Sequence, residues 1–374
     1  MTRFLLVLSI CLIPVDASAC GGFFCDNLLV PVDQTAERIL FRVNADETIT
    51  TFVEISYTGE PEQFAWVIPT PVPLDVADIE VRGAELFDEL EVATRPRFRF
   101  VSASGASAER SSGCGGFDGR EAPDPFWEED VEVLATLDIG PFSLEVIEAT
   151  DAENFNIWLA VNGYATTATA DGALGHYIDG GMAFLGVKLN PSAVEGPLDT
   201  LVFSYPAREP MIPIILTAIA AVDDMEVLTY VLADEPYTPS NYGVLDFDFD
   251  LVERDGNSTT YEALLPGAVD DAGGHAFAVE LAQPVANLSE VGETAAEVLA
   301  TGRYLTRMRT YLSADEMTVD PMFSATPGAA DVSNLHDVPD REMRSGWGEG
   351  TLAYLIPALV LLGFLVRRRR ASTG

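Results

Sequence analysis

The sequence predicts a β-rich α+β fold of antiparallel sheets with a few short helices, followed by one C-terminal transmembrane helix. Three observations support this prediction. Short segments of alternating or continuous apolar residues recur through the middle of the chain, as expected for strands. One longer segment carries helix start and stop signals instead, and a second segment is also interpreted as a helix. An apolar run followed by four arginines lies at the C-terminal end, which is typical of a membrane anchor.

Strand-like segments are the commonest feature. The segments 38–43 ("RILFRV") and 48–57 ("TITTFVEISY") flank a polar turn and predict a hairpin. A second hairpin is predicted from "DVEVLATL" and "FSLEVI", joined across 140–141. The continuous apolar run "FAWVIP" indicates a strand covered on both faces. The remaining strands are predicted from "MAFLGVKLN", "DTLVFSY", "MIPIILTAIA" and "MEVLTYVLA", with Asp223 and Asp224 joining the last two.

Two helices and a set of boundaries complete the predicted organisation. The clearest helix covers 150–163, with Asp151 as its cap and Gly163 at its C-terminal stop. A second helix is expected over 289–300. The predicted divisions are a signal peptide (1–19), an N-terminal β-rich domain (20–100), a Ser/Gly-rich loop or linker (101–129), an α+β domain (130–320), a stalk (321–350), a transmembrane helix (351–366) and a cytoplasmic arginine-rich tail (367–374).

The two ends of the chain predict export and anchoring. Arg3, the apolar run 4–15 and the small residues 17–19 have the order of a secretory signal, so the mature chain should begin at Cys20. The apolar segment 351–366 is marginally long for a bilayer, and snorkelling arginines can make up the difference. Its cytoplasmic side is marked by Arg367, Arg368, Arg369 and Arg370. We therefore expect a single-pass cell-membrane protein whose ectodomain is periplasmic or extracellular.

The charge balance limits the partners. The formal net charge is −38, and Lys188 is the only lysine in the chain. Such acidity argues against a nucleic-acid partner, because nucleic-acid binding needs a basic footprint. It suits a solvated exterior exposed to salt, or a surface that attracts divalent cations.

Three cysteines, Cys20, Cys25 and Cys114, remain after the signal peptide is removed, and an odd number leaves two pairings open. With ordinary signal-peptidase cleavage, Cys20 and Cys25 form a short loop, while Cys114 stays free or pairs between chains. With lipidation of Cys20, Cys25 is left to pair with Cys114. The unlipidated chain is favoured, because the tail helix already supplies a firm anchor.

Catalytic and metal motifs are missing from the sequence pattern. His176, His275 and His336 are isolated and form no metal-ligand spacing, so no cofactor is expected. The segment "DFDFDL" (246–251) alternates carboxylates with apolar residues but does not fit the EF-hand template. We interpret it as a strand whose apolar side chains point inward.

Several segments in combination resemble domain-of-unknown-function family 2330, a family of bacterial secreted or surface-anchored proteins. The segments that carry the resemblance are "ACGGFFC", "PVDQTAERILFRV", "FAWVIPTP", "WLAVNGY", "FLGVKLN" and "YLTRMRTYLSADEMTVDPMF". The resemblance implies a bacterial envelope destination and supplies no chemistry. The tail is also similar to bacterial C-terminal sorting signals, in which the short motif is Ser345, Gly346, Trp347 and Gly348.

These features predict a non-enzymatic envelope module that binds an unknown envelope partner or contributes to envelope structure. The alternative is an envelope hydrolase or metal-dependent enzyme that uses the scattered carboxylates of Asp223, Asp224, Asp246 and Asp248. A deep pocket holding two or more carboxyl groups with raised pKa values would favour the enzyme.

Overall fold

The structure is a computed structural model, and it describes residues 33–58, 65–101, 130–164, 170–189, 198–219, 221–256 and 258–340. Several predictions lie outside these residues. They concern the signal peptide, the three cysteines, most of the Ser/Gly-rich segment, the sorting motif, the transmembrane segment 351–366 and the arginine tail. Within the described residues, no helix has both the length and the apolar character needed to cross a bilayer.

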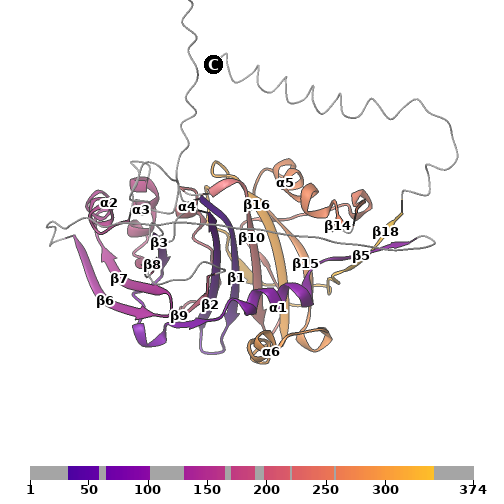
Figure 1. The fold of residues 1–374 in the computed structure, drawn as a ribbon, viewed down its shortest axis with the longest axis horizontal. Coiled ribbons are helices and arrows are strands. Elements are labelled where there is room, and N and C mark those ends of the chain that lie inside the picture. The colour runs from indigo at the N-terminus through magenta and orange to yellow at the C-terminus, as the bar shows by residue number, and fades with distance from the viewer. Residues whose placement is uncertain are drawn as a thin grey trace, which may run out of the picture.

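A mixed eight-stranded sheet, here called sheet A, forms the centre of the fold (Figure 1). Its strands follow the order β12 (Gly243–Val244), β15 (Ala276–Pro284), β16 (Tyr304–Leu312), β10 (Ala221–Ala233), β1 (Asp33–Val43), β2 (Thr48–Thr58), β9 (Thr200–Pro206) and β4 (Glu80–Arg82). The predicted β1–β2 hairpin is confirmed. The pairings β1–β10 and β12–β15 are parallel, so the sheet is not wholly antiparallel as predicted. Strands from both sides of the 101–129 segment share this sheet.

A second, antiparallel sheet of four strands, sheet B, packs on one face of sheet A. Its order is β3 (Ala65–Thr70), β8 (Ala183–Leu189), β7 (Phe142–Ala149) and β6 (Val131–Ile139). The second predicted hairpin is β6–β7, whose turn holds Gly140 at a positive φ of 56°. All six residues of β3 are buried, as the continuous apolar run predicted.

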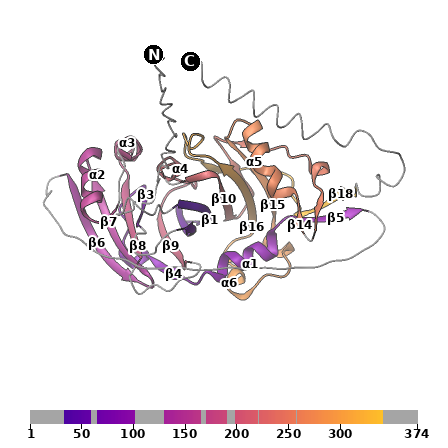
Figure 2. The ribbon, with the colours of Figure 1, turned by 45° about the horizontal axis from the view of Figure 1, so that its top comes forward.

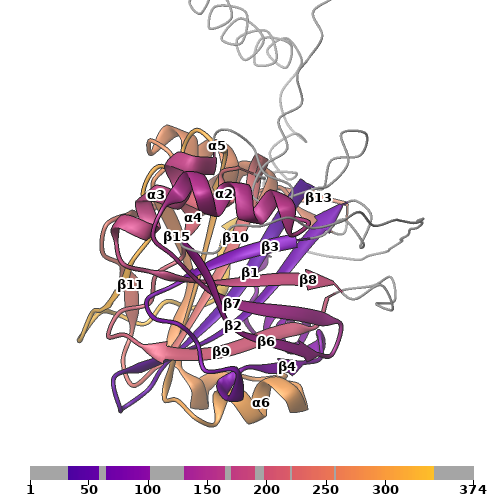
Figure 3. The same ribbon diagram turned by 90° about the vertical axis from the view of Figure 1, so that its left-hand side faces the viewer.

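The helices close the two outer faces of the stacked sheets. Sheet A packs against α1 (Glu85–Thr94) and α6 (Glu293–Leu299) on the face away from sheet B. The outer face of sheet B is covered by α2 (Ala152–Val161) and α3 (Ala170–Asp179), as seen from the side in Figure 3. The predicted cap on α2 is present, because the Asp151 carboxylate accepts a hydrogen bond from the backbone N–H of Asn154. The layers therefore run helix, sheet B, sheet A, helix.

Two strand predictions are wrong. The segment 211–220 contains the short helix α4 (Ile214–Thr217) rather than a strand, because its apolar side chains pack into two hydrophobic cores, with Ile214 in one and Leu216 in the other. Figure 2 shows α4 near β1 and β3. Asp223 and Asp224 lie inside β10 instead of joining two strands. The "DFDFDL" segment forms the 3₁₀ helix η3 (Phe249–Leu251), in which the Asp248 carboxylate caps the turn.

The described part of the predicted stalk, 321–340, is folded onto the body. β17 (Phe323–Ala325) pairs with β11 (Tyr237–Pro239), and β18 (Leu335–Pro339) pairs in parallel with β5 (Arg97–Val101). Buried apolar side chains hold both strands in place, since Phe323 is fully buried and Val338 is nearly so. The segment is polar and contains several prolines, so its composition gave no indication of these few buried residues.

The remaining elements are short or lie at the periphery of sheet A. They are the helix α5 (Tyr261–Asp271), the 3₁₀ helices η2 (Val76–Asp78) and η4 (Val285–Asn287), and the ribbon of β13 (Arg254–Asp255) with β14 (Ser258–Thr259). α5 packs beside β16 near the edge of the sheet, and its Tyr261 and Leu265 are buried. The predicted second helix, 289–300, corresponds to the shorter α6.

Candidate functional site

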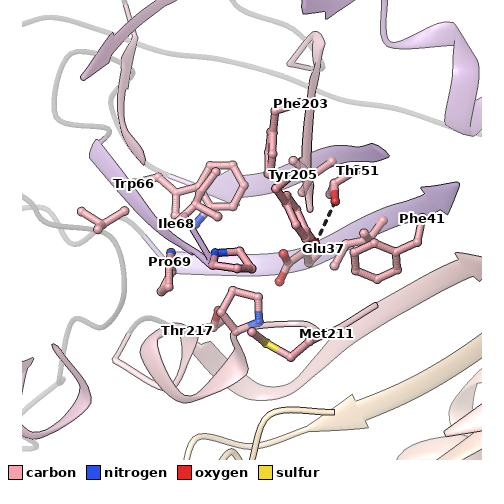
Figure 4. Close-up of a pocket in the computed structure, with 15 residues that line it drawn as sticks. Glu37, Phe41, Thr51, Trp66, Ile68, Pro69, Phe203, Tyr205, Met211 and Thr217 are labelled. Carbon is pink, nitrogen blue, oxygen red and sulfur yellow. Dashed lines mark hydrogen bonds between the residues drawn. The ribbon is translucent and has the colours of Figure 1, made fainter. Parts of the chain in front are cut away.

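A pocket opens between sheet A and the edge strand β3 of sheet B, and it is the candidate functional site (Figure 4). Its volume is about 40 Å³, which is enough for about three water molecules. The walls come from β1, β2 and β9 on one side, from β3 on another, and from the segment 211–217 on a third. Pro71, Met211 and Pro213 are partly exposed and form its rim.

Apolar and aromatic side chains make up most of the wall, because β1, β2 and β9 each contribute alternate inward residues and the edge strand β3 runs along the pocket. The apolar lining consists of Ile39, Phe41, Val53, Trp66, Val67, Ile68, Pro69, Pro71, Phe203, Met211 and Pro213, together with the ring of Tyr205. The polar groups are few. They are the carboxyl of Glu37 and the hydroxyls of Thr51, Tyr205 and Thr217. The Thr51 hydroxyl donates a hydrogen bond to the phenol oxygen of Tyr205, with 3.3 Å between the two oxygen atoms.

Glu37 is the one charged side chain that lines the pocket among the described residues. It is 4% exposed, and its carboxyl points into the space between Pro69 and Tyr205 (Figure 4). Burial raises the pKa of Glu37 from its ordinary 4.5 to about 7, against a smaller lowering by the side chain of Gln34. In the described part of the chain, no lysine, arginine or histidine forms an ion pair with it. The pocket therefore holds a carboxyl group that changes charge near neutral pH.

A β-bulge places Gln34 beside Glu37. Between positions 34 and 36 the register of β1 shifts against β2, so that one extra residue stands opposite the partner strand. Positions 34 and 37 would point to opposite faces of a regular strand, and the bulge brings them to the same face. The Gln34 amide nitrogen then donates to Glu37 Oε2 at 3.4 Å. This long contact leaves the other carboxyl oxygen available to the pocket.

A second cluster of buried charged groups lies on the opposite face of sheet A. Arg307 and Arg309 project from β16 toward α1 and α5, and both are almost fully buried. Glu280 of β15 lies between them, 2.5 Å from Arg307 Nε and 3.1 Å from Arg309 Nε. A bulge in β15 turns Glu280 and Leu281 to the same face. A fully buried carboxylate thus receives two guanidinium groups.

Side chains from the covering helices complete this cluster. Glu91 of α1 pairs with Arg307 at 2.7 Å, and the same guanidinium donates to Thr94 and Tyr230, each at 3.0 Å. The Arg307 guanidinium also lowers the pKa of Glu91 below its usual value, although burial alone would raise it. From α5, Tyr261 donates to Glu280 at 3.0 Å. Because its members contact each other rather than an open space, we interpret the cluster as a tie that holds α1 and α5 on the sheet.

The carboxylates of the predicted enzyme do not line the pocket. Asp223 and Asp224 lie on β10. Burial raises the pKa of Asp224, and the negative charge of Asp270 on α5 makes a smaller contribution in the same direction. Asp248 caps the N-terminus of η3, and Asp246 lies in the irregular segment before it. Across the described ranges, no set of three or more histidine, cysteine or acidic side chains is arranged to hold a metal ion.

The three histidines lie in separate places. His176 is on α3 beside Tyr177, with ring centroids 5.1 Å apart. His275 Nε2 lies 3.2 Å from the Thr318 hydroxyl. His336 of β18 stacks on Phe249, with ring centroids 3.8 Å apart. Burial lowers the pKa of His336.

The sequence analysis did not identify Glu37 in the pocket, nor Arg307 and Arg309 in the buried charged cluster. One signal for the pocket was present, because Glu37 shares the alternation of Ile39 and Phe41 on an otherwise apolar strand face. A similar signal marked Arg307 and Arg309 in the strand-like segment "YLTRMRTYL". A charge at an inward-facing strand position indicates a buried ion pair or a functional group.

The fold and the pocket define a β-rich α+β domain with a small, mainly apolar inter-sheet site. The chain belongs to the bacterial family DUF2330, described as "uncharacterized protein conserved in bacteria", whose model matches residues 14–324. The predicted family resemblance is thereby confirmed. A search of curated proteins gives no match.

Among solved structures, the crystal structure of baculovirus P35 matches at 10% identity, covering 83% of this chain and 98% of that chain. The TM-score is 0.29, which is too low to support an inference about fold or function.

Proposed function

We propose that this protein is a single-pass bacterial cell-envelope protein whose ectodomain acts as a binding module, with the inter-sheet pocket as its binding site. The observation that carries the proposal is the pocket itself, in which one carboxyl group is set among aromatic and aliphatic walls. Ligand-binding pockets are usually lined by apolar side chains, with a small number of polar groups that point into the same space.

A binding role fits this composition better than hydrolysis by paired carboxylates. Acid–base hydrolysis of that kind places two carboxyl groups on either side of the reacting bond. Within the part of the chain that the structure describes, the pocket is lined by one carboxyl group, and the four aspartates of the alternative lie on β10 and around η3. The envelope location is supported by the signal-like N-terminal segment and the apolar, arginine-flanked C-terminal segment.

The position of Lys188 allows the orientation to be tested. It is the only lysine of the chain, and its side chain is 30% exposed beside Glu145. If the ectodomain faces outward, a membrane-impermeant amine reagent added to intact spheroplasts should modify Lys188, as read by peptide mapping. The Lys188→Arg variant serves as the control and should lose that modified peptide. Modification that appears only after the cells are lysed would place the folded part in the cytosol and overturn the envelope assignment.

The binding role predicts that filling the rim of the pocket abolishes capture of the partner. Met211→Trp places a bulky ring at the rim, whereas Met322→Trp changes a methionine that forms a β-bridge with Met211 and does not line the pocket. Full-length protein is cross-linked in intact envelopes and purified, and bound species are identified by mass spectrometry. A species held by the wild type and by Met322→Trp, but lost with Met211→Trp, is expected. Equal recovery from all three proteins would contradict the assignment of the pocket.

A further inference from the structure

We propose that the pocket binds an alkylammonium group, either of a small free amine or of a lysine side chain, through the carboxylate of Glu37 and the surrounding aromatic rings. This inference rests on the proposed binding function and names the class of ligand. Three features of the pocket support it: an unneutralised carboxyl group, aromatic walls, and a matching size.

The carboxyl group supplies the charge that an ammonium needs. In the described part of the chain, no cationic side chain pairs with Glu37, and the side-chain hydrogen bond that it accepts there is the 3.4 Å contact from Gln34. A buried carboxylate without a counter-ion is costly, and a cation brought beside it removes much of that cost. An ammonium ligand would therefore neutralise a charge that no cationic side chain of the described residues pairs with.

The walls supply the second component. Trp66, Tyr205, Phe203 and Phe41 all line the same space, coming from β3, β9 and β1. The faces of such rings attract cations, and cages of aromatic side chains recognise methylated ammonium groups. An anionic ligand would instead meet the carboxylate and the negative faces of the rings. The overall charge of −38 also concentrates cations rather than anions around the protein.

Size limits the ligand to one small group. A volume of about 40 Å³ corresponds to about three water molecules, which is close to the bulk of an ammonium head with a few carbon atoms. The partly exposed rim of Pro71, Met211 and Pro213 leaves the group connected to solvent. A longer ligand would place its ammonium end inside and its remainder outside.

The charge of the pocket depends on pH through Glu37. Two titratable side chains line the pocket among the described residues, Glu37 and Tyr205. Burial raises the pKa of Tyr205 above its ordinary value, so that the phenol stays neutral. Opposite Glu37, β2 places Ile55 and β10 places Val227, which are both apolar. The other hydroxyl side chains that line the pocket, Thr51 and Thr217, are uncharged. Ammonium binding needs the ionised carboxylate, so the affinity should increase as the pH rises through about 7.

The test is calorimetric titration of the purified full-length protein with four probes. Choline is a small free molecule with a quaternary ammonium group, and N-acetyl-lysine amide presents the primary ammonium of a lysine side chain. The two probes therefore distinguish a small free ammonium compound from a lysine side chain. The alcohol 3,3-dimethylbutan-1-ol has the shape of choline without its charge, and acetate has the opposite charge. We expect at least one ammonium probe to bind about tenfold more tightly than the neutral alcohol and acetate. We also expect its affinity to be about tenfold higher at pH 8.5 than at pH 5.5.

Variants separate the two components of the site. Glu37→Gln should lower the affinity for the ammonium probe at pH 8.5 about tenfold and remove its pH dependence. Trp66→Leu should weaken binding but keep the pH dependence, and Glu132→Gln, on the exposed face of β6, should behave as the wild type. The proposal is wrong if the neutral alcohol binds as tightly as both ammonium probes, if Glu37→Gln binds unchanged, or if neither ammonium probe binds. In that last case, loss of partner capture with Met211→Trp would still support the pocket as a binding site for another ligand.

Discussion

Replacing Glu37 with glutamine should make the folded protein more stable above pH 8 by about 3 kcal/mol, and this gain should disappear below pH 4. The cause is the rise in the pKa of Glu37 from 4.5 to about 7 on burial. Between these values the folded chain binds more protons than the unfolded chain, so wild-type stability falls as the pH rises. Above about pH 7 the full cost of a buried carboxylate is present. The neutral amide of glutamine does not incur it.

The measurement is the difference in the free energy of unfolding between Glu37→Gln and the wild type, from urea titrations at several pH values. Other titrating groups are common to both proteins and cancel in this difference. Glu132→Gln, at an exposed position of β6, provides the control and should show a difference that does not vary with pH. Parallel stability curves for Glu37→Gln and the wild type would mean that Glu37 is not held in an apolar pocket.

Replacing Arg307 with alanine should lower the free energy of unfolding by about 3–5 kcal/mol, because it removes one cation from a buried cluster. Arg307 is fully buried and contacts Glu280, Glu91, Thr94 and Tyr230. Its loss leaves Glu280 with one guanidinium and frees the contact of α1 with the sheet. The measurement is a urea titration followed by tryptophan fluorescence.

The matched control is Arg303→Ala, four residues earlier in the chain. Arg303 is 82% exposed and lies 3.5 Å from an equally exposed Asp234, so its removal should change stability by about 0.5 kcal/mol or less. Arg307→Met separates charge from volume, since it keeps most of the bulk but not the guanidinium. If Arg307→Met is as stable as the wild type, packing rather than ion pairing explains the position. If Arg307→Ala costs no more than Arg303→Ala, the buried cluster does not tie the helices to the sheet.

Local patterns predicted much of the β-structure correctly. The hairpins β1–β2 and β6–β7, the buried strand β3 and the capped helix α2 all follow from alternation, turn residues and capping chemistry within a few neighbouring residues. Prediction was wrong where tertiary packing overrides such patterns. The apolar segment 211–220 resembles a strand in composition, yet α4 forms there because it covers the end of the inter-sheet space.

The candidate site shows the same limit. Glu37, Trp66 and Tyr205 come from three strands widely separated in the sequence, and no local motif connects them. The bulges in β1 and β15 were equally hidden, because an extra residue in one strand is defined only by its partner strand. Because of these bulges, the side chain of Gln34 contacts Glu37, and the side chains of Glu280 and Leu281 lie on the same face of sheet A.

By itself, the sequence determined that this is a β-rich, strongly acidic bacterial protein of the DUF2330 family, since alternation, composition and family motifs are all written along the chain. Only the tertiary structure decided that strands from both sides of the 101–129 segment build one sheet, that residues 321–340 fold onto the body, and that the carboxyl group of Glu37 lies in an apolar pocket. The physical reason is that burial is a property of the packed layers. The same glutamate on an exposed strand face would be an ordinary solvated charge.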